Sequence, residues 1–378
     1  MKHIAYLLLF SAYLLTSCNS DRITDTIPEG QGMVAFIIET ESQLTTRTVL
    51  NGSENQQHAS SVYLYVFNAS DQCVRVRQVP WPSPADAEVN YHTVRRNYSL
   101  TLPAGNYTFL AVGLDDAAGT TYNLPNAIRE GTSLAKATVT LATGKTKDDI
   151  ARSELFAGYA EATVTDGIKT TTTIELWRRV GGIMGWFTNI PTQIGGTNLS
   201  GIQISLYARQ NKSGYLIPKP VGDHFPFGII NPANFNDYIT DTTSLPADSR
   251  ILVSLKLPAN LTSSTVVSGG SYILPAAAPP VGDGSEYTLR VEFIGENNAM
   301  LKIMRVQMGE GDDLYISPTG SGTGIIDMGG PFRFPIVANR FYGIGSATTP
   351  IDLGGDQDDI IITIDPGWEG QVPDIDLE

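Results

Sequence analysis

The chain has 378 residues, and its 39 acidic side chains outnumber the 25 Lys and Arg side chains, which gives a formal net charge of −14 at pH 7. An acidic chain without a basic patch is not of the kind that binds nucleic acid, so we exclude nucleic acid as a partner. The length predicts two domains rather than one. The 37 Gly and 22 Pro residues punctuate short apolar runs, a pattern typical of β-sandwiches and barrels.

The first segment, residues 1–17, has the layout of a lipoprotein signal peptide. Lys2 precedes a mainly apolar run at residues 4–15, which is shorter than the roughly 20 residues that a membrane-spanning helix needs and fits a signal-peptide core. The letters LTSC then place small residues before Cys18, as in a bacterial lipobox. We expect cleavage before Cys18 and lipidation of its thiol; an ordinary signal peptide with a chance cysteine is the alternative.

Residues 18–31 are polar, contain Pro and Gly and show no apolar periodicity, so we predict a flexible tether. Several acyl chains on one cysteine hold a protein firmly, since each buried CH₂ contributes about 0.8 kcal/mol. Asn19 follows the cysteine, and the aspartate that usually signals retention in the inner membrane is missing. We therefore predict a lipid-anchored protein of the outer membrane, exposed at the cell surface.

The rest of the chain is a succession of short strand patterns. Runs rich in β-branched and aromatic residues, each bounded by turn-forming residues, predict strands. These runs are residues 32–40, 61–68, 73–79, 98–114, 170–191, 201–209, 250–257, 286–295, 299–308 and 358–368. Helical periodicity is weak, and we expect short helices at residues 132–138 and 145–155. The predicted fold class is all-β, with two tandem sandwich domains.

The domain boundary is predicted near residue 180, because Gly181 and Gly182 interrupt the longest strand pattern and glycine inside a strand marks a bend, a bulge or a close backbone approach. The N-terminal domain then covers residues 32–180 and the C-terminal domain residues 181–378. Two stretches rich in Gly, Pro and Ser, residues 262–285 and 317–332, are predicted to be long surface loops.

Alternation of side chains predicts which strands are buried. Residues 61–68 are apolar on both faces, which predicts a central strand covered on both sides. One face carries aliphatic and the other aromatic side chains (Val62, Leu64, Val66; Tyr63, Tyr65, Phe67). In the segment that follows the PAGN turn, Tyr107, Phe109 and Ala111 alternate, and we expect them to pack in a core rather than to stack on a ligand.

The sequence contains no pattern that predicts catalysis, a cofactor or a metal. The four histidines have none of the spacings of a zinc site, and neither a nucleophile elbow nor a phosphate-binding glycine loop is present. Cys73 alternates with valines in a strand pattern and lacks a disulfide partner once Cys18 carries lipid. The acidic stretch at residues 352–360 lacks the residue order and closing Glu of a calcium loop, so we interpret it as a turn. We predict a protein that is not an enzyme.

Lipobox, tether and several later segments occur in an order that resembles the fimbrillin superfamily of Bacteroides-type pili. The segments are SVYLYVFNASDQCV, YSLTLPAGNYTFLAVG, IELWRRVGGIMGWFTNIP, and the closing pair PIVANRFYGI and DDIIITIDPGW. Within the superfamily, the chain is similar to the FimB-like branch of anchor and accessory subunits. The resemblance implies two fimbrillin-type sandwich domains, transthyretin- or immunoglobulin-like, in a lipoprotein that binds other fimbrial subunits.

The resemblance also implies a mechanism of assembly. In polymerising members, a protease cuts after an early arginine, the first strand leaves, and a neighbouring subunit's strand fills the groove. Added strands gain main-chain hydrogen bonds and place alternate side chains in pockets. By resemblance, Arg47 is the candidate processing site. Residues 359–365 contain four apolar residues (Ile360, Ile361, Ile362, Ile364). This candidate strand could pair within its own sheet or be donated to a neighbouring subunit.

Three alternatives to an uncleaved anchor stay open. A stalk or tip adhesin subunit would be cut at Arg47, lose its lipid and meet ligands on host or bacterial surfaces. A glycan-binding surface lipoprotein would expose an aromatic platform, for which Trp81 and Trp368 are the candidates, although packing at a sheet edge is the simpler role for both. A β-rich hydrolase would need a cleft with two converging carboxylates.

Overall fold

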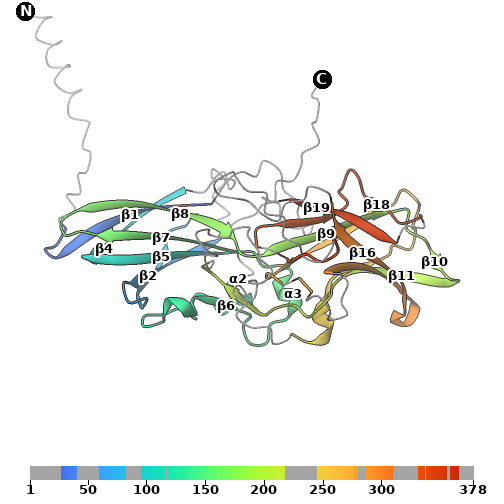
Figure 1. Ribbon diagram of the computed structural model, residues 1–378, viewed down its shortest axis with the longest axis horizontal. Helices are drawn as coiled ribbons and strands as arrows, with labels where there is room; N and C mark the ends of the chain where they lie inside the picture. Colours follow the sequence, from blue (N-terminus) through green and yellow to red (C-terminus); the bar gives the residue numbers. More distant parts are fainter. Residues whose placement is uncertain are drawn as a thin grey trace, which may run out of the picture.

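The computed structural model describes residues 27–40, 59–81, 95–115, 118–217, 245–276, 278–279, 287–309, 331–336, 338–355 and 358–365. Within this described part the chain is almost entirely β-structure, as the sequence predicted (Figure 1). No helix among these residues is long and apolar enough to cross a membrane.

The first half of the chain forms a seven-stranded sheet in the order β3-β2-β5-β7-β8-β1-β4. The bounds are β1 Gln31–Thr40, β2 Ser61–Asn68, β3 Cys73–Val79, β4 Arg95–Pro103, β5 Gly105–Leu114, β7 Leu155–Val164 and β8 Lys169–Arg178. Strands β7 and β8 pair at Phe156 and Ala157, and the sheet folds over at this corner. Strands β4, β1 and β8 make one layer, and β3, β2, β5 and β7 make the other.

A dry core fills the space between these two layers. Phe36 of β1 and Phe109 of β5 meet edge to face, with ring centroids 4.8 Å apart, a favoured geometry for aromatic pairs. Around them lie aliphatic side chains from both layers, which include Val34, Ile38, Val62, Leu64, Val66, Leu100, Ala111, Ile174 and Leu176. The predicted core roles of Phe109 and Ala111 are confirmed.

The opposite face of β2 and β5 is covered as well. Tyr65, Phe67 and Leu110 point into a second core, which is closed by the segment between β5 and β7. That segment contains the short helices α2 (Ala118–Thr121), η1 (Leu134–Lys136) and α3 (Lys147–Ile150) and the strand β6 (Thr138–Thr140). The central position predicted for β2 and the two predicted helices are therefore confirmed, whereas α2 was not predicted.

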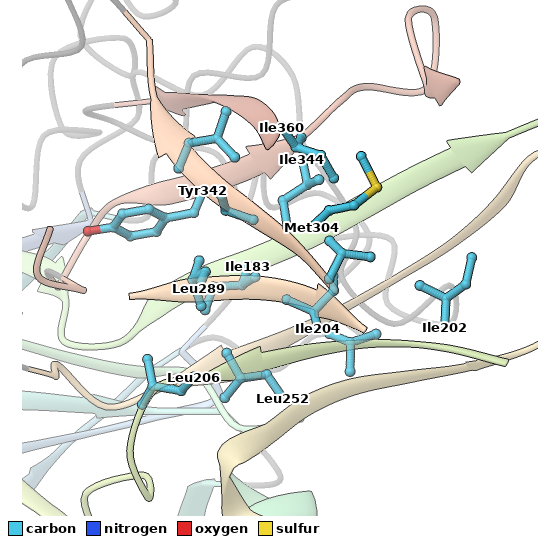
Figure 2. Packing of buried hydrophobic residues seen from close by; sticks show 14 of the residues in the cluster. Ile183, Ile202, Ile204, Leu206, Leu252, Leu289, Met304, Tyr342, Ile344 and Ile360 are labelled. Atoms are coloured by element: carbon cyan, nitrogen blue, oxygen red, sulfur yellow. The ribbon is translucent and has the colours of Figure 1, made fainter. Parts of the chain in front are cut away.

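The second half of the chain forms a ten-stranded sheet whose main path is β10-β11-β15-β16-β19-β17-β9-β14, with β13 beside β11 and β18 beside β9. The bounds are β9 Gly181–Thr188, β10 Gln193–Ile194, β11 Thr197–Leu206, β13 Ile251–Lys256, β14 Val267–Ile273, β15 Leu289–Gly295, β16 Met300–Met308, β17 Phe341–Ile344, β18 Ile351–Asp352 and β19 Asp359–Asp365. Side chains from many of these strands converge on one core, where Figure 2 shows Ile183, Ile204, Leu289 and Met304.

The sequence prediction was wrong at β14, which lies inside the stretch predicted to be a surface loop, and it missed β7. Both strands contain glycines that weaken a strand pattern but are needed for packing. A Cβ at Gly269 of β14 would lie 2.6 Å from Leu255, and a Cβ at Gly158 of β7 would lie 1.8 Å from the carbonyl oxygen of Glu175. These glycines allow neighbouring parts of the backbone to approach closely. In the sequence alone, the same glycines indicate a turn.

The two halves share packing at their junction. Only Arg179 and Val180 separate β8 from β9, and Gly181 and Gly182 begin β9 in regular register with its neighbours on both sides. The second core takes in side chains from both halves, and β6 pairs with β12 (Ser213–Tyr215) of the second half. A domain boundary at residues 180 and 181 stays our proposal, in agreement with the point where one sheet ends and the next begins.

Candidate functional site

Strand β1 occupies the middle of its layer and is paired on both sides. Residues 31–39 pair with β4 in antiparallel register, and residues 33–40 pair with β8 in parallel register. Most backbone groups of the strand therefore lie within reach of a ladder partner. The groove that β1 fills is bounded by β4 and β8, and the core between the two layers forms its floor.

The side chains of β1 explain why this strand fits the groove. Val34, Phe36 and Ile38 alternate toward the core, and each is at most 1 % exposed. The intervening Ala35 and Ile37 lie on the outer face and are half-buried. A strand that replaced β1 would need the same period of two, with one large side chain at the Phe36 position, because register decides which face is buried.

The entry to β1 is held by two neighbouring turns. The Gly30 amide donates to Oδ1 of Asp166 at 2.8 Å, and the Met33 amide donates to the Ile168 carbonyl at 3.0 Å. In return, the Ala104 amide of the β4–β5 turn donates to the Gly30 carbonyl at 3.1 Å. We call this group of contacts around residues 30–33 the collar of β1.

Gly32 is what lets the collar close. A Cβ at Gly32 would lie 2.3 Å from the carbonyl oxygen of Thr165 and 2.7 Å from the side chain of Val164. Real Cβ atoms do not approach backbone oxygen this closely, so a larger residue would push the β7–β8 turn away. The sequence contains Gly32 at the start of a predicted strand, but nothing in the sequence indicates that residues 164–168 are its neighbours.

Strand β19, the candidate for donation, lies within its own sheet. Residues 359–362 pair with β16 in parallel register, and residues 363–365 pair with β17 in antiparallel register. Ile360 and Ile362 are 2 % exposed, whereas Ile361 is 60 % exposed; Figure 2 shows Ile360 pointing into the same core as Tyr342 and Ile344. Among the described residues, β19 thus lies between β16 and β17 in the sheet, with β16 paired to its first half and β17 to its second half.

Two cross-strand ion pairs accompany β19. Arg305 of β16 donates from Nε and Nη2 to the two carboxylate oxygens of Asp359 at 3.1 and 3.3 Å, and its guanidinium lies 4.3 Å from the ring centre of Phe332. Lys302 lies 3.8 Å from Asp358, which is largely exposed. The bidentate pair has the stronger geometry, and it ties the start of β19 to β16.

A buried ion pair lies at the corner where β7 meets β8. Arg178 donates from Nε and Nη2 to Oε1 of Glu154 at 2.9 and 2.7 Å, and the two side chains are 3 % and 1 % exposed. Asp115 accepts from the Glu154 amide at 2.7 Å. The Arg178 guanidinium lies 5.7 Å from the Phe156 ring centre. The sequence shows the arginine pair at residues 178–179 but gives no sign of its acidic partner.

The remaining candidate residues fall into two groups. Cys18, Arg47, Trp368 and the side chain of Ile364 lie outside the described residues. Trp81 is half-buried and packs against the first core, and Asp352 accepts from Asn189 at 2.9 Å and from the Gly354 amide at 2.8 Å. Among the described residues, no group of three or more His, Cys, Asp or Glu side chains could hold a metal ion.

Cys73 should be inert in the folded protein. Its thiol is 2 % exposed, and burial raises its pKa, so the nucleophilic thiolate is disfavoured. Because the folded-state pKa is the higher one, the thiol contributes stability below its ordinary pKa of about 8.5 and loses that contribution as the pH rises through its folded-state pKa. In a Cys18→Ser variant, we expect no reaction with a thiol reagent at pH 8 until denaturant is added; fast labelling of the native protein would contradict this burial.

The family of the chain follows from a comparison with family models. Residues 36–220 match the model described as fimbrillin-A associated anchor proteins Mfa1 and Mfa2. This match supports the fimbrillin-type family for the chain. The matched segment runs from within β1 to just beyond β12 and so contains β4, β8 and the junction of the two sheets. The predicted resemblance is confirmed at the level of the family.

Solved structures similar to this fimbrillin-type chain include three from the Bacteroidales. A putative cell adhesion protein from Parabacteroides distasonis is 11 % identical, with coverage of 91 % of this chain and 99 % of that chain and a TM-score of 0.48. The fimbrilin FimA of Porphyromonas gingivalis is 13 % identical, with 92 % and 100 % covered and a TM-score of 0.43. The tip fimbrial protein Mfa3 of the same species is 12 % identical, with 88 % and 98 % covered and a TM-score of 0.38. No curated protein matches the sequence.

Proposed function

We propose that this fimbrillin-type chain is an uncleaved, non-enzymatic lipoprotein subunit that anchors a fimbria to the outer membrane or assists its assembly. The match to a fimbrillin-type family model supports a fimbrial role at the cell surface, and the matched model is that of anchor proteins. Lipid attachment at Cys18, contact with other fimbrial subunits through strand complementation and the lack of catalysis are the finer parts of the proposal.

The observation that carries the proposal is the position of β1. Cys18 precedes β1 in the sequence, so a lipid on Cys18 is joined to the folded body through this strand. Strand β1 is paired on both sides and three of its side chains are buried, so cleavage after this strand would remove part of the first sheet. This supports a subunit that keeps both the strand and its lipid, as an anchor requires.

Contact with another subunit then involves a different strand. While β1 fills its own groove, no second strand can enter between β4 and β8. In strand β19, Ile361 is 60 % exposed, whereas Ile360 and Ile362 are buried in the core. Strand addition by another chain gains main-chain hydrogen bonds and places alternate side chains in pockets, and an exposed apolar side chain such as Ile361 suits such a contact. We therefore propose the β19 region, with Ile361 exposed at its surface, as the contact with a neighbouring subunit.

The test is the covalent state of the protein purified from its own outer membrane. We expect an intact mass with acyl chains and a first residue of Cys18. A chain that begins at Thr48 without lipid would overturn the anchor role and support a processed subunit. An Arg47→Ala variant is the matched control: it should leave the mass and location of an uncleaved anchor unchanged, whereas it should block maturation of a processed subunit.

The second candidate function is a processed stalk or tip adhesin subunit. The groove of β1 supports it, because loss of this strand would leave a slot with a hydrophobic floor between β4 and β8, and Arg47 follows β1 closely in the sequence. A glycan-binding role receives less support, since Trp81 packs against the first core instead of forming an exposed platform.

A further inference from the structure

The order and direction of the strands determine the path that a pulling force would take through this chain. Strands β1 and β8 are parallel, and the C-terminal end of β8 leads through two residues into β9 of the second sheet. The start of β1 therefore lies at the pole of the first domain that is remote from the second domain. Figure 1 shows this arrangement, with β1 toward one end of the long axis and the β10–β11 hairpin at the other.

We propose that β1 is a mechanical clamp that carries tension between the N-terminal tether and the second domain. A pull on the tether draws the start of β1 outward, while a pull on the second domain draws the end of β8 the opposite way. Two neighbouring parallel strands drawn from opposite ends are loaded in shear. In shear, the hydrogen bonds of the ladder must stretch together instead of opening one at a time, so the resistance is high.

Three observations show a strand suited to this task. The ladders to β4 and β8 both run along nearly the whole of β1, so sliding must break both at once. Sliding by one residue would also bring the half-buried Ile37 to the core face and expose Phe36, because side chains alternate with a period of two. Finally, the collar holds the point where tension enters, through the bonds from Gly30 to Asp166 and from Met33 to Ile168.

The clamp rests on the proposed anchoring role for its biological use, but its mechanics can be tested on the purified chain without lipid. The experiment is single-molecule force spectroscopy on the chain from Cys18 onward. One handle is attached at Cys18, since Cys73 is buried, and the other at Thr197→Cys, an exposed position at the start of β11. The expected result is one high-force event in which the first domain gives way.

A matched control moves the first handle by one strand. In a Cys18→Ser, Lys169→Cys variant, the handle lies at the start of β8, beside Met33 in the ladder. Tension then passes along the backbone of β8 into β9 and bypasses β1, so the high-force event of the first domain should disappear. The clamp is overturned if both handle positions give the same rupture force.

Two variants test the collar. Asp166→Ala removes the acceptor of the Gly30 amide at an exposed site, and we expect the unfolding rate at fixed force to rise roughly two- to tenfold, as for the loss of one hydrogen bond. Gly32→Ala should raise the rate further, because its Cβ would meet Thr165. Gly119→Ala, where a Cβ meets nothing within 4 Å, is the control. No change with Asp166→Ala and Gly32→Ala would show that the collar carries no load.

The outcomes separate the clamp from the anchor. Forced unfolding reports the unfolding rate of the purified fold and does not depend on lipid. A low rupture force for β1, found together with acylated Cys18, would reject the proposed clamp but leave the proposed anchoring role supported. A strong β1 in a protein that begins at Thr48 in cells would reject the anchor and keep the mechanical property of the uncleaved chain.

Discussion

An Arg178→Met variant should lose about 3–5 kcal/mol of its free energy of unfolding. The substitution keeps much of the apolar volume but leaves the Glu154 carboxylate, which is 1 % exposed, without its counter-ion. An unpaired charge in such a place cannot regain its hydration. Urea denaturation followed by far-UV circular dichroism measures the change through the midpoint and slope of the transition.

Two controls decide whether burial causes this loss. Arg95 of β4 pairs with Glu39 of β1 at 3.7 Å, with side chains 59 % and 27 % exposed, so Arg95→Met should change the free energy of unfolding by about 0–1 kcal/mol. A double variant, Glu154→Leu with Arg178→Met, should recover most of the loss, because a hydrophobic replacement of a buried pair is often close to neutral. Equal effects of Arg178→Met and Arg95→Met would contradict the buried pair.

Phe36→Ala should also destabilise the chain by about 3–5 kcal/mol. Phe36 is 1 % exposed and meets Phe109 edge to face across the two layers, so its removal leaves a cavity in the middle of the first core. Loss of the ring also removes contacts between β1 and the first core. The same urea titration measures the effect, and tryptophan fluorescence, to which Trp81 on this core contributes, gives a second signal.

The control for Phe36→Ala is on the next residue of the same strand. Ile37 lies on the outer face and is half-buried, so Ile37→Thr, which keeps the branched Cβ, should cost no more than about 1 kcal/mol. If Ile37→Thr were the more damaging change, the strand would be in the opposite register and the groove described here would be wrong. The same result would remove the basis for β1 as a clamp.

The comparison of the predicted with the observed strands follows one physical rule. Strand β2 was predicted with its full extent and with both faces covered. The prediction succeeded because the alternation of side chains with a period of two is a local property of the sequence and matches the geometry of a strand. Strands β7 and β14 were missed, since their glycines are required by neighbours that are remote in the sequence. Gly158 faces Glu175 and Gly269 faces Leu255, and a local pattern does not carry such pairings.

The sequence by itself determined the class of the chain. Its short alternating runs predict an all-β fold, which the structure confirms, and the order of its segments predicts the fimbrillin type, which the family model supports. Its first segment and Cys18 predict an exported lipoprotein, which stays a prediction. Each of these predictions depends on residues that are close together in the sequence, because the length of an apolar run and its period are local properties.

Only the tertiary structure decided how these parts act together. It brings β1 between β4 and β8, buries Arg178 against Glu154, and closes the turn at residues 165–168 on Gly32. Each of these contacts joins residues that are far apart in the chain, and each depends on which strands pair and in which direction. Strand pairing is chosen by the burial of whole faces at once, so it is settled by the complete fold and not by any one segment.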